Sequence, residues 1–136
     1  MKNEFLLTFE GGLPKGTNQE KRFNSRTGHF YKDKKLSALE QTFAYALRPH
    51  RPKTPSEQPI RLNLWFVFSI TSPKRLWGTW KVTKPDVDNY PKTFIDQMVK
   101  EGFFKDDSFI VDLRVRKTYG EKASIFVQWE ELGERP

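Results

Sequence analysis

Apolar and polar side chains alternate most regularly over residues 60–70, which predicts one long β-strand. Its apolar positions are Ile60, Leu62, Leu64, Phe66, Phe68 and Ile70. Because alternate residues of a strand point to opposite faces, this set forms a single apolar surface that must be buried. Trp65 and Val67 point to the other face, and their apolar character predicts that a helix or a second subunit covers them.

Shorter alternating stretches predict three further strands. One lies at residues 5–9, and two more lie at residues 109–117 and 123–129. The last two are separated only by a turn around Gly120, which predicts that they pair with each other as a hairpin. In residues 109–117 the inward positions are Val111, Leu113 and Val115, and the outward positions are Asp112, Arg114 and Arg116.

Two stretches have the period of an amphipathic helix. The first is residues 33–47, with Asp33 as the expected N-cap. The second is residues 90–101, which follows Asn89 as a possible cap and is ended by Gly102. The apolar stripes are Leu36, Leu39, Phe43, Ala46 and Leu47 in the first helix, and Phe94, Ile95, Met98 and Val99 in the second. Pro91 is tolerated because it falls in the first turn.

This order of elements predicts an α+β fold with a small mixed β-sheet and two helices. The length of 136 residues fits a single domain, residues 1–136, whose tail at 130–136 is expected to fray. The twelve Phe and four Trp provide a dense core. The chain has no cysteine and no long apolar run, so we expect a cytoplasmic protein without disulfides, thiolate zinc sites, signal peptide or membrane span.

The charge balance favours a polyanionic partner. The chain has 24 Lys and Arg against 17 Asp and Glu, a formal net charge of +7. Residues 21–31 are expected to be irregular or a short hairpin, and their Arg22 and Arg26 make them either a solvated loop or an arm that contacts phosphates.

A second basic segment, residues 71–83, interleaves cations with aromatic side chains. Its members are Lys74, Arg75, Trp77, Trp80 and Lys81. Such a mixture suits stacking on unpaired bases, although one or both tryptophans could instead fold back onto the body. The segment has no helical or strand period, so we expect a loop that is mobile and becomes ordered when it binds nucleic acid.

Carboxylates gather in the stretch that follows. In an extended strand, Asp86 and Asp88 point the same way with Cα atoms ~7 Å apart, where they repel each other unless a cation lies between them. The twelve-residue helix spans about 18 Å, after which Asp107 can return beside them. Lys92 lies one helical turn beyond Asp88. This combination predicts a Mg²⁺ site that cuts nucleic acid.

Each feature alone has an ordinary explanation. Asp-x-Asp pairs are common on solvated loops, and adjacent aspartates are common where strands begin. Their combination, joined by a helix of suitable length and flanked by Lys84, Lys92 and Lys105, favours the functional interpretation. His29 and His50 lie in loops far along the sequence from these acids, so we expect neither to be a ligand or a general base.

The stretch 84–117 resembles the signature of the RusA-type Holliday junction resolvases, endodeoxyribonucleases of bacteria, phages and prophages. The likeness rests on Lys84, Pro85, Asp86, Val87, Asp88, Asn89, Lys92, Asp96, Gly102, Phe103, Asp106, Asp107, Val111 and Lys117. Tyr90, where the family usually has leucine, and Pro91 depart from the family pattern. The resemblance implies Mg²⁺, replaceable by Mn²⁺, held by Asp86, Asp88 and Asp107. It also implies assistance by Lys92, four-way DNA junctions as substrate, a homodimer, and no small-molecule cofactor.

Two alternatives remain for the function. One is a nuclease for flaps or single strands, which the carboxylates fit equally well, and the other is a nucleic-acid-binding protein that does not cut. In every case the cations expected to contact DNA are Lys74, Arg75, Lys81, Lys84, Arg114, Lys117, Arg22 and Arg26.

Overall fold

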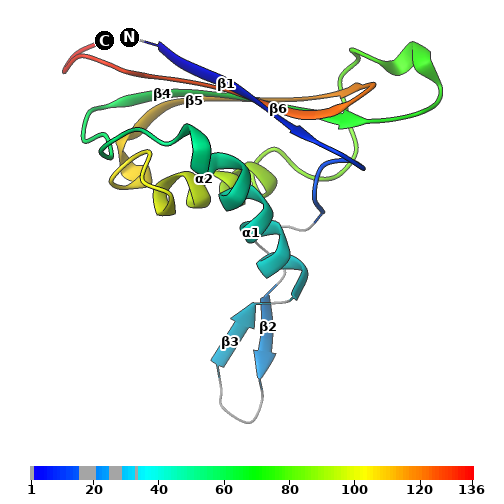
Figure 1. Ribbon diagram of the computed structural model, residues 1–136, viewed down its shortest axis with the longest axis horizontal. Helices are drawn as coiled ribbons and strands as arrows, with labels where there is room; N and C mark the ends of the chain where they lie inside the picture. Colours follow the sequence, from blue (N-terminus) through cyan, green and yellow to red (C-terminus); the bar gives the residue numbers. More distant parts are fainter. Residues whose placement is uncertain (1, 16–20, 25–28, 33) are drawn as a thin grey trace.

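A four-stranded mixed sheet forms the body of the computed structural model (Figure 1), which describes residues 2–15, 21–24, 29–32 and 34–136. Its strands are β1 (Lys2–Phe9), β4 (Ile60–Ser69), β5 (Ile110–Gly120) and β6 (Ala123–Glu131). The spatial order is β1-β6-β4-β5, with β4 and β5 parallel and the other neighbours antiparallel. The predicted α+β class with a mixed sheet is confirmed.

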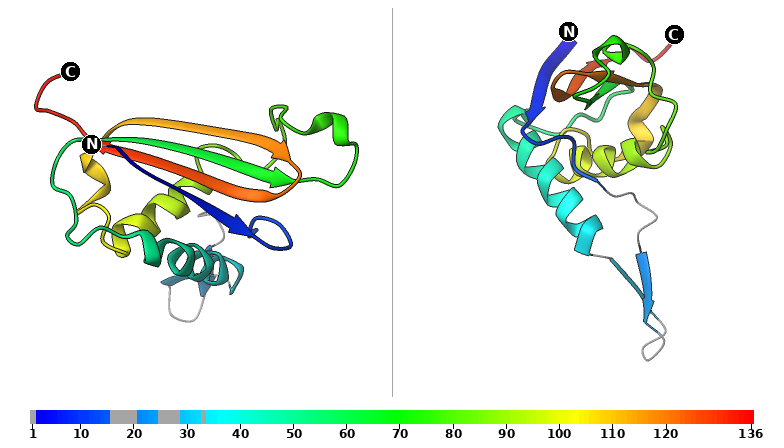
Figure 2. Two further views of the ribbon diagram at one scale, coloured as in Figure 1. Left: turned by 45° about the horizontal axis from the view of Figure 1, so that its top comes forward. Right: turned by 90° about the vertical axis from the view of Figure 1, so that its right-hand side faces the viewer.

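Two helices, α1 (Lys34–Leu47) and α2 (Tyr90–Lys100), cover one face of this sheet (Figures 1 and 2). Short 3₁₀ turns lie at η1 (Arg48–His50), η2 (Lys74–Leu76) and η3 (Asp107–Phe109). Within the described ranges, no helix has the length and apolar character needed to cross a bilayer.

A separate hairpin, β2 (Lys21–Asn24) with β3 (His29–Lys32), extends away from the sheet beyond the start of α1. Of the two expectations for this segment, the short hairpin is therefore confirmed. Arg22 belongs to β2, whereas Arg26 and Asp33 lie outside the described residues.

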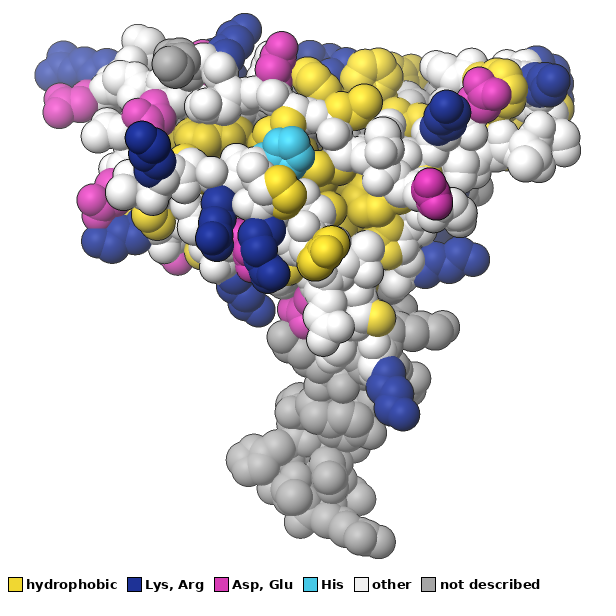
Figure 3. Space-filling view, viewed as in Figure 1, with side chains coloured by type: hydrophobic (Ala, Val, Ile, Leu, Met, Phe, Trp, Pro, Cys, Tyr) yellow, Lys and Arg dark blue, Asp and Glu magenta, His cyan; other side chains and the backbone are white. Residues whose placement is uncertain are grey.

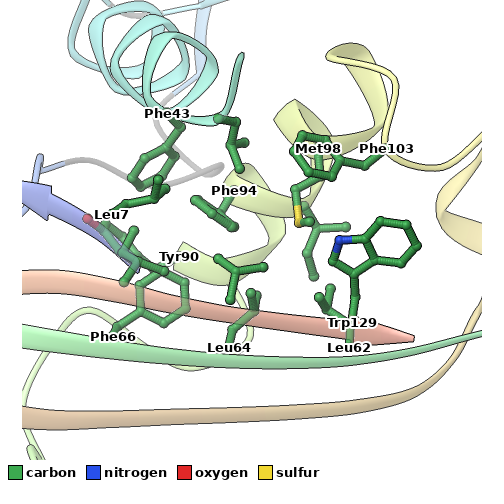
Figure 4. Close-up of a cluster of buried hydrophobic side chains, with 14 of the residues drawn as sticks. Leu7, Phe43, Leu62, Leu64, Phe66, Tyr90, Phe94, Met98, Phe103 and Trp129 are labelled. Atoms are coloured by element: carbon green, nitrogen blue, oxygen red, sulfur yellow. The ribbon is translucent and has the colours of Figure 1, made fainter. Parts of the chain in front are cut away.

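The core between sheet and helices is aromatic (Figure 4). Phe43 of α1 meets Phe94 of α2 edge to face, with ring centroids 5.1 Å apart. Phe66 of β4 meets Tyr90 in the same way at 5.4 Å. Because such pairs add to the burial of apolar area, they attach both helices to the sheet in one arrangement. The helical stripes read from the sequence are the ones that face this core.

Among the described residues no helix covers the opposite face of the sheet, so that part of the expectation for Trp65 was wrong. The guanidinium of Arg116 lies over the Trp65 ring, 4.4 Å from its centroid, and the indole Nε1 donates to Thr118 Oγ1 at 2.9 Å. Two residues of the neighbouring strand β5 thus cover much of this side chain.

The predicted pairing of the last two strands was also wrong, because β4 lies between them. Leu64 of β4 has Val115 of β5 on one side and Val127 of β6 on the other. The most apolar strand takes the buried central position, and the strand that carries Asp112 and Arg114 takes the edge. The connection at residues 121–122 therefore crosses the end of β4.

The position of β5 at the edge of the sheet also explains why some of its inward side chains are exposed. Leu113 pairs with the buried Leu62 and so lies on the helix side of the sheet as expected, yet it remains 48% exposed, and Val111 is 62% exposed. The tail also begins later than predicted, because Glu130 and Glu131 belong to β6 and Leu132 donates its N–H to the Pro59 carbonyl at 2.7 Å. Fraying of residues 133–136 stays a prediction.

We expect Gly120→Ala to destabilise the fold by about 1–3 kcal/mol, the usual cost of an overpacked site. The crossing over β4 brings Gly120 so close to Val67 that an added Cβ would clash with Val67 Cγ1. Urea unfolding measures the change. Gly133→Ala is the matched control, since its Cβ would meet nothing within 4 Å. Equal midpoints for the two variants would contradict this explanation.

Candidate functional site

The segment that carries Asp86 and Asp88 is a series of bends and turns, so its predicted extended geometry was wrong. Tyr90 N–H donates to the Asp86 carbonyl at 3.2 Å, which makes residues 86–90 one helical turn ahead of α2. Both residues nevertheless precede α2 at its N-terminal end. The helix dipole favours negative charge at that end.

Asn89 takes the N-cap position of α2 without acting as the cap that was expected. Its backbone is already helical, with φ −90° and ψ −46°, and its side chain makes no capping hydrogen bond. The turn that begins at Asp86 satisfies the first N–H of the helix instead. Pro91 lies in the first turn, as predicted.

Lys117 of β5 holds this segment against the sheet. Its ammonium donates to the carbonyls of Thr83 and Pro85, the latter at 2.8 Å. The peptide bond between Lys84 and Pro85 is cis. Burial, followed by the charge of nearby Lys81, lowers the pKa of Lys117. The contact of Lys117 with DNA stays a prediction, because in this arrangement its donors face its own chain.

The far end of α2 has the termination predicted for it. Gly102 has φ +88°, a left-handed conformation that glycine adopts without strain. Phe103 N–H donates to the Met98 carbonyl at 2.9 Å, and Gly102 N–H donates to the Val99 carbonyl at 3.0 Å. This pair of bonds is the Schellman arrangement. It reverses the chain and leads it back toward η3.

Asp106 and Asp107 have different environments in η3. Asp106 is the N-cap, and its Oδ2 accepts a hydrogen bond from Ser108 N–H at 3.1 Å, which lowers the pKa of Asp106. The Asp107 side chain is exposed and makes no hydrogen bond or ion pair with the part of the chain that the structure describes, while the Asp107 carbonyl accepts a hydrogen bond from Ile110 N–H. Asp106 and Asp107 therefore differ because the Asp106 side chain caps the 3₁₀ turn and the Asp107 side chain does not.

Asp96 belongs to the same acidic group and was not assigned a role from the sequence. Burial raises the pKa of Asp96, and the charge of Asp107 raises it further, while Lys92 opposes both. These three side chains are therefore electrostatic neighbours on one side of α2. The spacing of four residues from Asp88 to Lys92 and from Lys92 to Asp96 could have indicated this shared helix face.

The oxygen donors form an open arrangement. Among the described residues, no three His, Asp or Glu side chains are close enough to enclose a metal ion. Mg²⁺ commonly uses only one or two carboxylates and fills its remaining positions with water and phosphate oxygens. The expected return of Asp107 beside Asp86 and Asp88 does not produce one three-carboxylate group here, and joint binding of a metal ion by these residues stays a prediction.

Comparison with known proteins agrees with this chemistry. A family model described as Endodeoxyribonuclease RusA matches residues 12–130. The chain belongs to this family. It is 31% identical over 131 residues to the Crossover junction endodeoxyribonuclease rusA of Lactococcus phage r1t, which covers 95% of this chain and 99% of the relative. It is also 29% identical over 133 residues to the uncharacterized protein YqaN of Bacillus subtilis strain 168, covering 89% of this chain and 88% of that protein.

In this RusA-family chain, the segment 71–83 is partly attached to the sheet. Gly78 N–H donates to the Tyr119 carbonyl at 2.8 Å, and Tyr119 N–H donates to the Thr79 carbonyl at 3.0 Å. Trp77 folds back, with its Nε1 donating to the Ile70 carbonyl at 2.8 Å. Trp80 is 65% exposed, and its stacking on a base stays a prediction. The mobility of the whole segment stays a prediction.

The cations expected to contact DNA occupy several different surroundings. Lys74 and Arg75 are exposed in η2 at the far end of the sheet, and Arg114 is exposed on β5. Lys84 pairs with Asp86, with Nζ and Oδ2 3.4 Å apart. In the view of Figure 3 basic side chains are spread over the body rather than gathered in one patch. His50 stacks on Phe5 at 4.3 Å, which supports its exclusion from the site.

We expect the double change of Lys74 and Arg75 to Ala to weaken DNA binding and to reduce its salt dependence. The slope of log affinity against log salt should fall by roughly 0.9 for each phosphate that the variant no longer neutralises. Fluorescence anisotropy at several salt concentrations measures that slope. The double change of Arg51 and Lys53 to Ala is the control, because both lie in a different connection. If the variant of Lys74 and Arg75 has the same salt slope as the control variant, η2 does not reach the DNA backbone.

Proposed function

We propose that this chain is a Mg²⁺-dependent endodeoxyribonuclease that resolves four-way DNA junctions. The observation that carries the proposal is the pair of carboxylates Asp86 and Asp88 at the start of α2, with Asp107 returned to the same helix, in a member of the RusA family. The junction substrate is taken from the phage relative, whose name describes a crossover junction endodeoxyribonuclease. Such a substrate is bacterial or phage DNA, so we place the reaction in the bacterial cytoplasm.

Asp86, Asp88 and Asp107 would hold the metal ion through carboxylate oxygens. When bound there, Mg²⁺ lowers the pKa of a water for in-line attack and offsets negative charge at the phosphorus. The carboxylates have a second task, which is to exclude any phosphate that arrives without the cation, because their charges repel it. The same donors also accept Mn²⁺.

Lys92 would hold the scissile phosphate against this group. It is exposed on α2, one turn beyond Asp88 and on the side where Asp96 and Asp107 lie. An ammonium so placed stabilises the charge that develops on phosphate oxygens during attack. Lys117 acts indirectly in this scheme, because it positions the backbone that presents Asp86.

Two other functions use the same residues. A nuclease for flaps or single strands would need the same metal site, whereas a binding protein that does not cut would need only the cations. Incubation with four-way junction, flap and linear duplex DNA, each with Mg²⁺, separates the three. Preferential cutting of the junction supports the proposal, and preference for either other substrate or no cutting overturns it.

We propose in addition that the active species is a symmetric homodimer that associates through the edge strand β5. A four-way junction has approximate two-fold symmetry, and its resolution needs a cut in each of two opposed strands, so a two-fold dimer presents two matching sites. Val111 and Leu113 are exposed apolar side chains on this edge. In the described residues, the segment 78–81 pairs with residues 117–119 along the outer edge of β5, which leaves residues 110–116 of that edge for a second chain.

We expect Asp86→Asn, Asp88→Asn and Asp107→Asn each to abolish junction cleavage and to leave DNA binding intact or stronger. Each change removes a metal ligand, but it also removes a negative charge that faces phosphate. Gel assays of cleavage and of binding, run on the same junction, measure the two effects separately.

Asp106→Asn is the control for these variants. Asn caps a helical turn about as well as Asp, so the Asp106→Asn variant should keep the structure of η3 and most of its cleavage activity on junction DNA. A ligand variant that still cuts at the wild-type rate in Mg²⁺ would remove that residue from the site.

We expect light scattering at micromolar concentration to give the mass of a dimer, with or without junction DNA. Leu113→Lys should produce monomers, because it places charge in the proposed contact. Leu6→Lys is the matched control, since Leu6 is 56% exposed on β1 at the opposite edge of the sheet. A wild-type chain that stays monomeric on the junction would exclude paired cutting by a dimer.

A further inference from the structure

A cavity of about 460 Å³ opens beside the proposed metal site and has no part in the mechanism above. It lies where the turn after β1, the end of β4 and the segment before α2 come together. Its lining residues are Gly11, Gly12, Leu13, Pro14, Lys15, Phe68, Ser69, Lys81, Lys84, Pro85 and Tyr90. A volume of this size is within the range of about 300–1,000 Å³ that is typical of sites for small organic groups.

The walls of the cavity are apolar, and internal contacts hold them in place. Phe68 is half-buried, with its ring 5.8 Å from the ring of Tyr90. The Tyr90 hydroxyl donates to the Pro14 carbonyl, which connects the start of α2 to the turn after β1. Burial raises the pKa of Tyr90, so its hydroxyl keeps the proton that this bond requires. The aromatic surface is therefore formed before any ligand arrives.

Three lysines and no carboxylate are present among the described residues that line the cavity. Lys81 has an internal role, because its Nζ lies 5.1 Å from the centre of the Phe68 ring and donates to Thr83 Oγ1 at 2.7 Å. Lys15 and Lys84 are exposed at the rim. An apolar slot with cations at its mouth complements a planar ring that is attached to a phosphate.

The position of Lys84 relates the cavity to the chemistry. Lys84 lines the cavity, and its ammonium is 3.4 Å from a carboxylate oxygen of Asp86. A phosphate held by Lys84 is thus next to the phosphate that the metal site would hold. Pro85 separates the two places along the chain, with one side toward the cavity.

We propose that this cavity takes one DNA base that has left its stack at the branch point, next to the phosphodiester that is cut. This inference rests on the proposed function. Unstacking is least costly for a base that is already unpaired, so a branch point supplies such a base more readily than a continuous duplex does. The cavity would then help to choose the position of the cut, with Phe68 as the stacking surface and Lys15 and Lys84 on the flanking phosphates.

The test removes single bases rather than whole nucleotides. Four-way junctions are made with one abasic site at a time near the branch point, and binding by the full chain is measured in EDTA so that no strand is cut. We expect one position at which loss of the base weakens wild-type binding by about 5- to 150-fold, the range for stacking of one base on an aromatic side chain.

Two variants test whether the base at that position of the junction is the one that the cavity binds. Phe68→Leu removes the ring and keeps apolar volume, while Ser69→Trp fills the cavity from an exposed position on its rim. In both variants, the intact junction and the critical abasic junction should bind equally well. Lys53→Gln, a change of an exposed lysine outside the cavity, should retain the wild-type pattern. Thermal unfolding confirms that each variant is folded.

The outcomes separate the inference from the proposed function. Wild-type binding that is insensitive to every abasic site overturns the cavity assignment alone. The same holds if a folded Phe68→Leu and a folded Ser69→Trp both keep the wild-type dependence on the critical base. A wild-type chain that binds junctions no better than linear duplex overturns the proposed function, and the base-binding role is then overturned with it.

Discussion

The parallel pairing of β4 with β5 is the constraint on which the site depends. Parallel neighbours cannot be joined by a tight turn, so the chain must cross over between them, and α2 is that crossover. The acidic residues lie at the two ends of this connection. Asp86 and Asp88 precede α2, and Asp107 follows it, so packing α2 against the sheet places distant acids along one helix. The same aromatic core that buries α2 therefore also fixes where the acidic residues before and after this helix lie.

Some charged groups of this region are already engaged by partners within the chain. Lys117 turns its ammonium toward two backbone carbonyls, and Asp106 is occupied as a cap. Asp88, Lys92 and Asp107 are exposed at the surface of the same region. An arrangement of this kind leaves carboxylates able to accept a cation and cations able to accept phosphate. A nuclease needs carboxylates and cations near one phosphodiester. Carboxylates alone would repel the DNA, and cations alone would hold it without cutting it.

The segment between β4 and α2 serves several tasks at once. Residues 71–83 carry an exposed tryptophan and two exposed cations away from the body, and then pair with β5. Lys84 and Pro85 line the cavity, and Asp86 begins the acidic group. Whatever the outer part of this segment contacts is thereby led toward the cavity and the carboxylates. The connection is short in sequence, so contacts made by one part constrain the position of the next.

Local periodicity in the sequence was enough to determine β1, β4, α1 and α2, and the family signature over 84–117 pointed to the acids and to Lys92. These features depend on neighbours within a few residues, and a period of 2 or 3.6 reports them directly. Other features needed the folded chain. Competition for the centre of the sheet placed β4 between β5 and β6, and a backbone turn replaced the expected extension at Asp86. The environment of Asp96 and the cavity beside Phe68 also arise only when segments distant in sequence pack together, and no local pattern records such contacts.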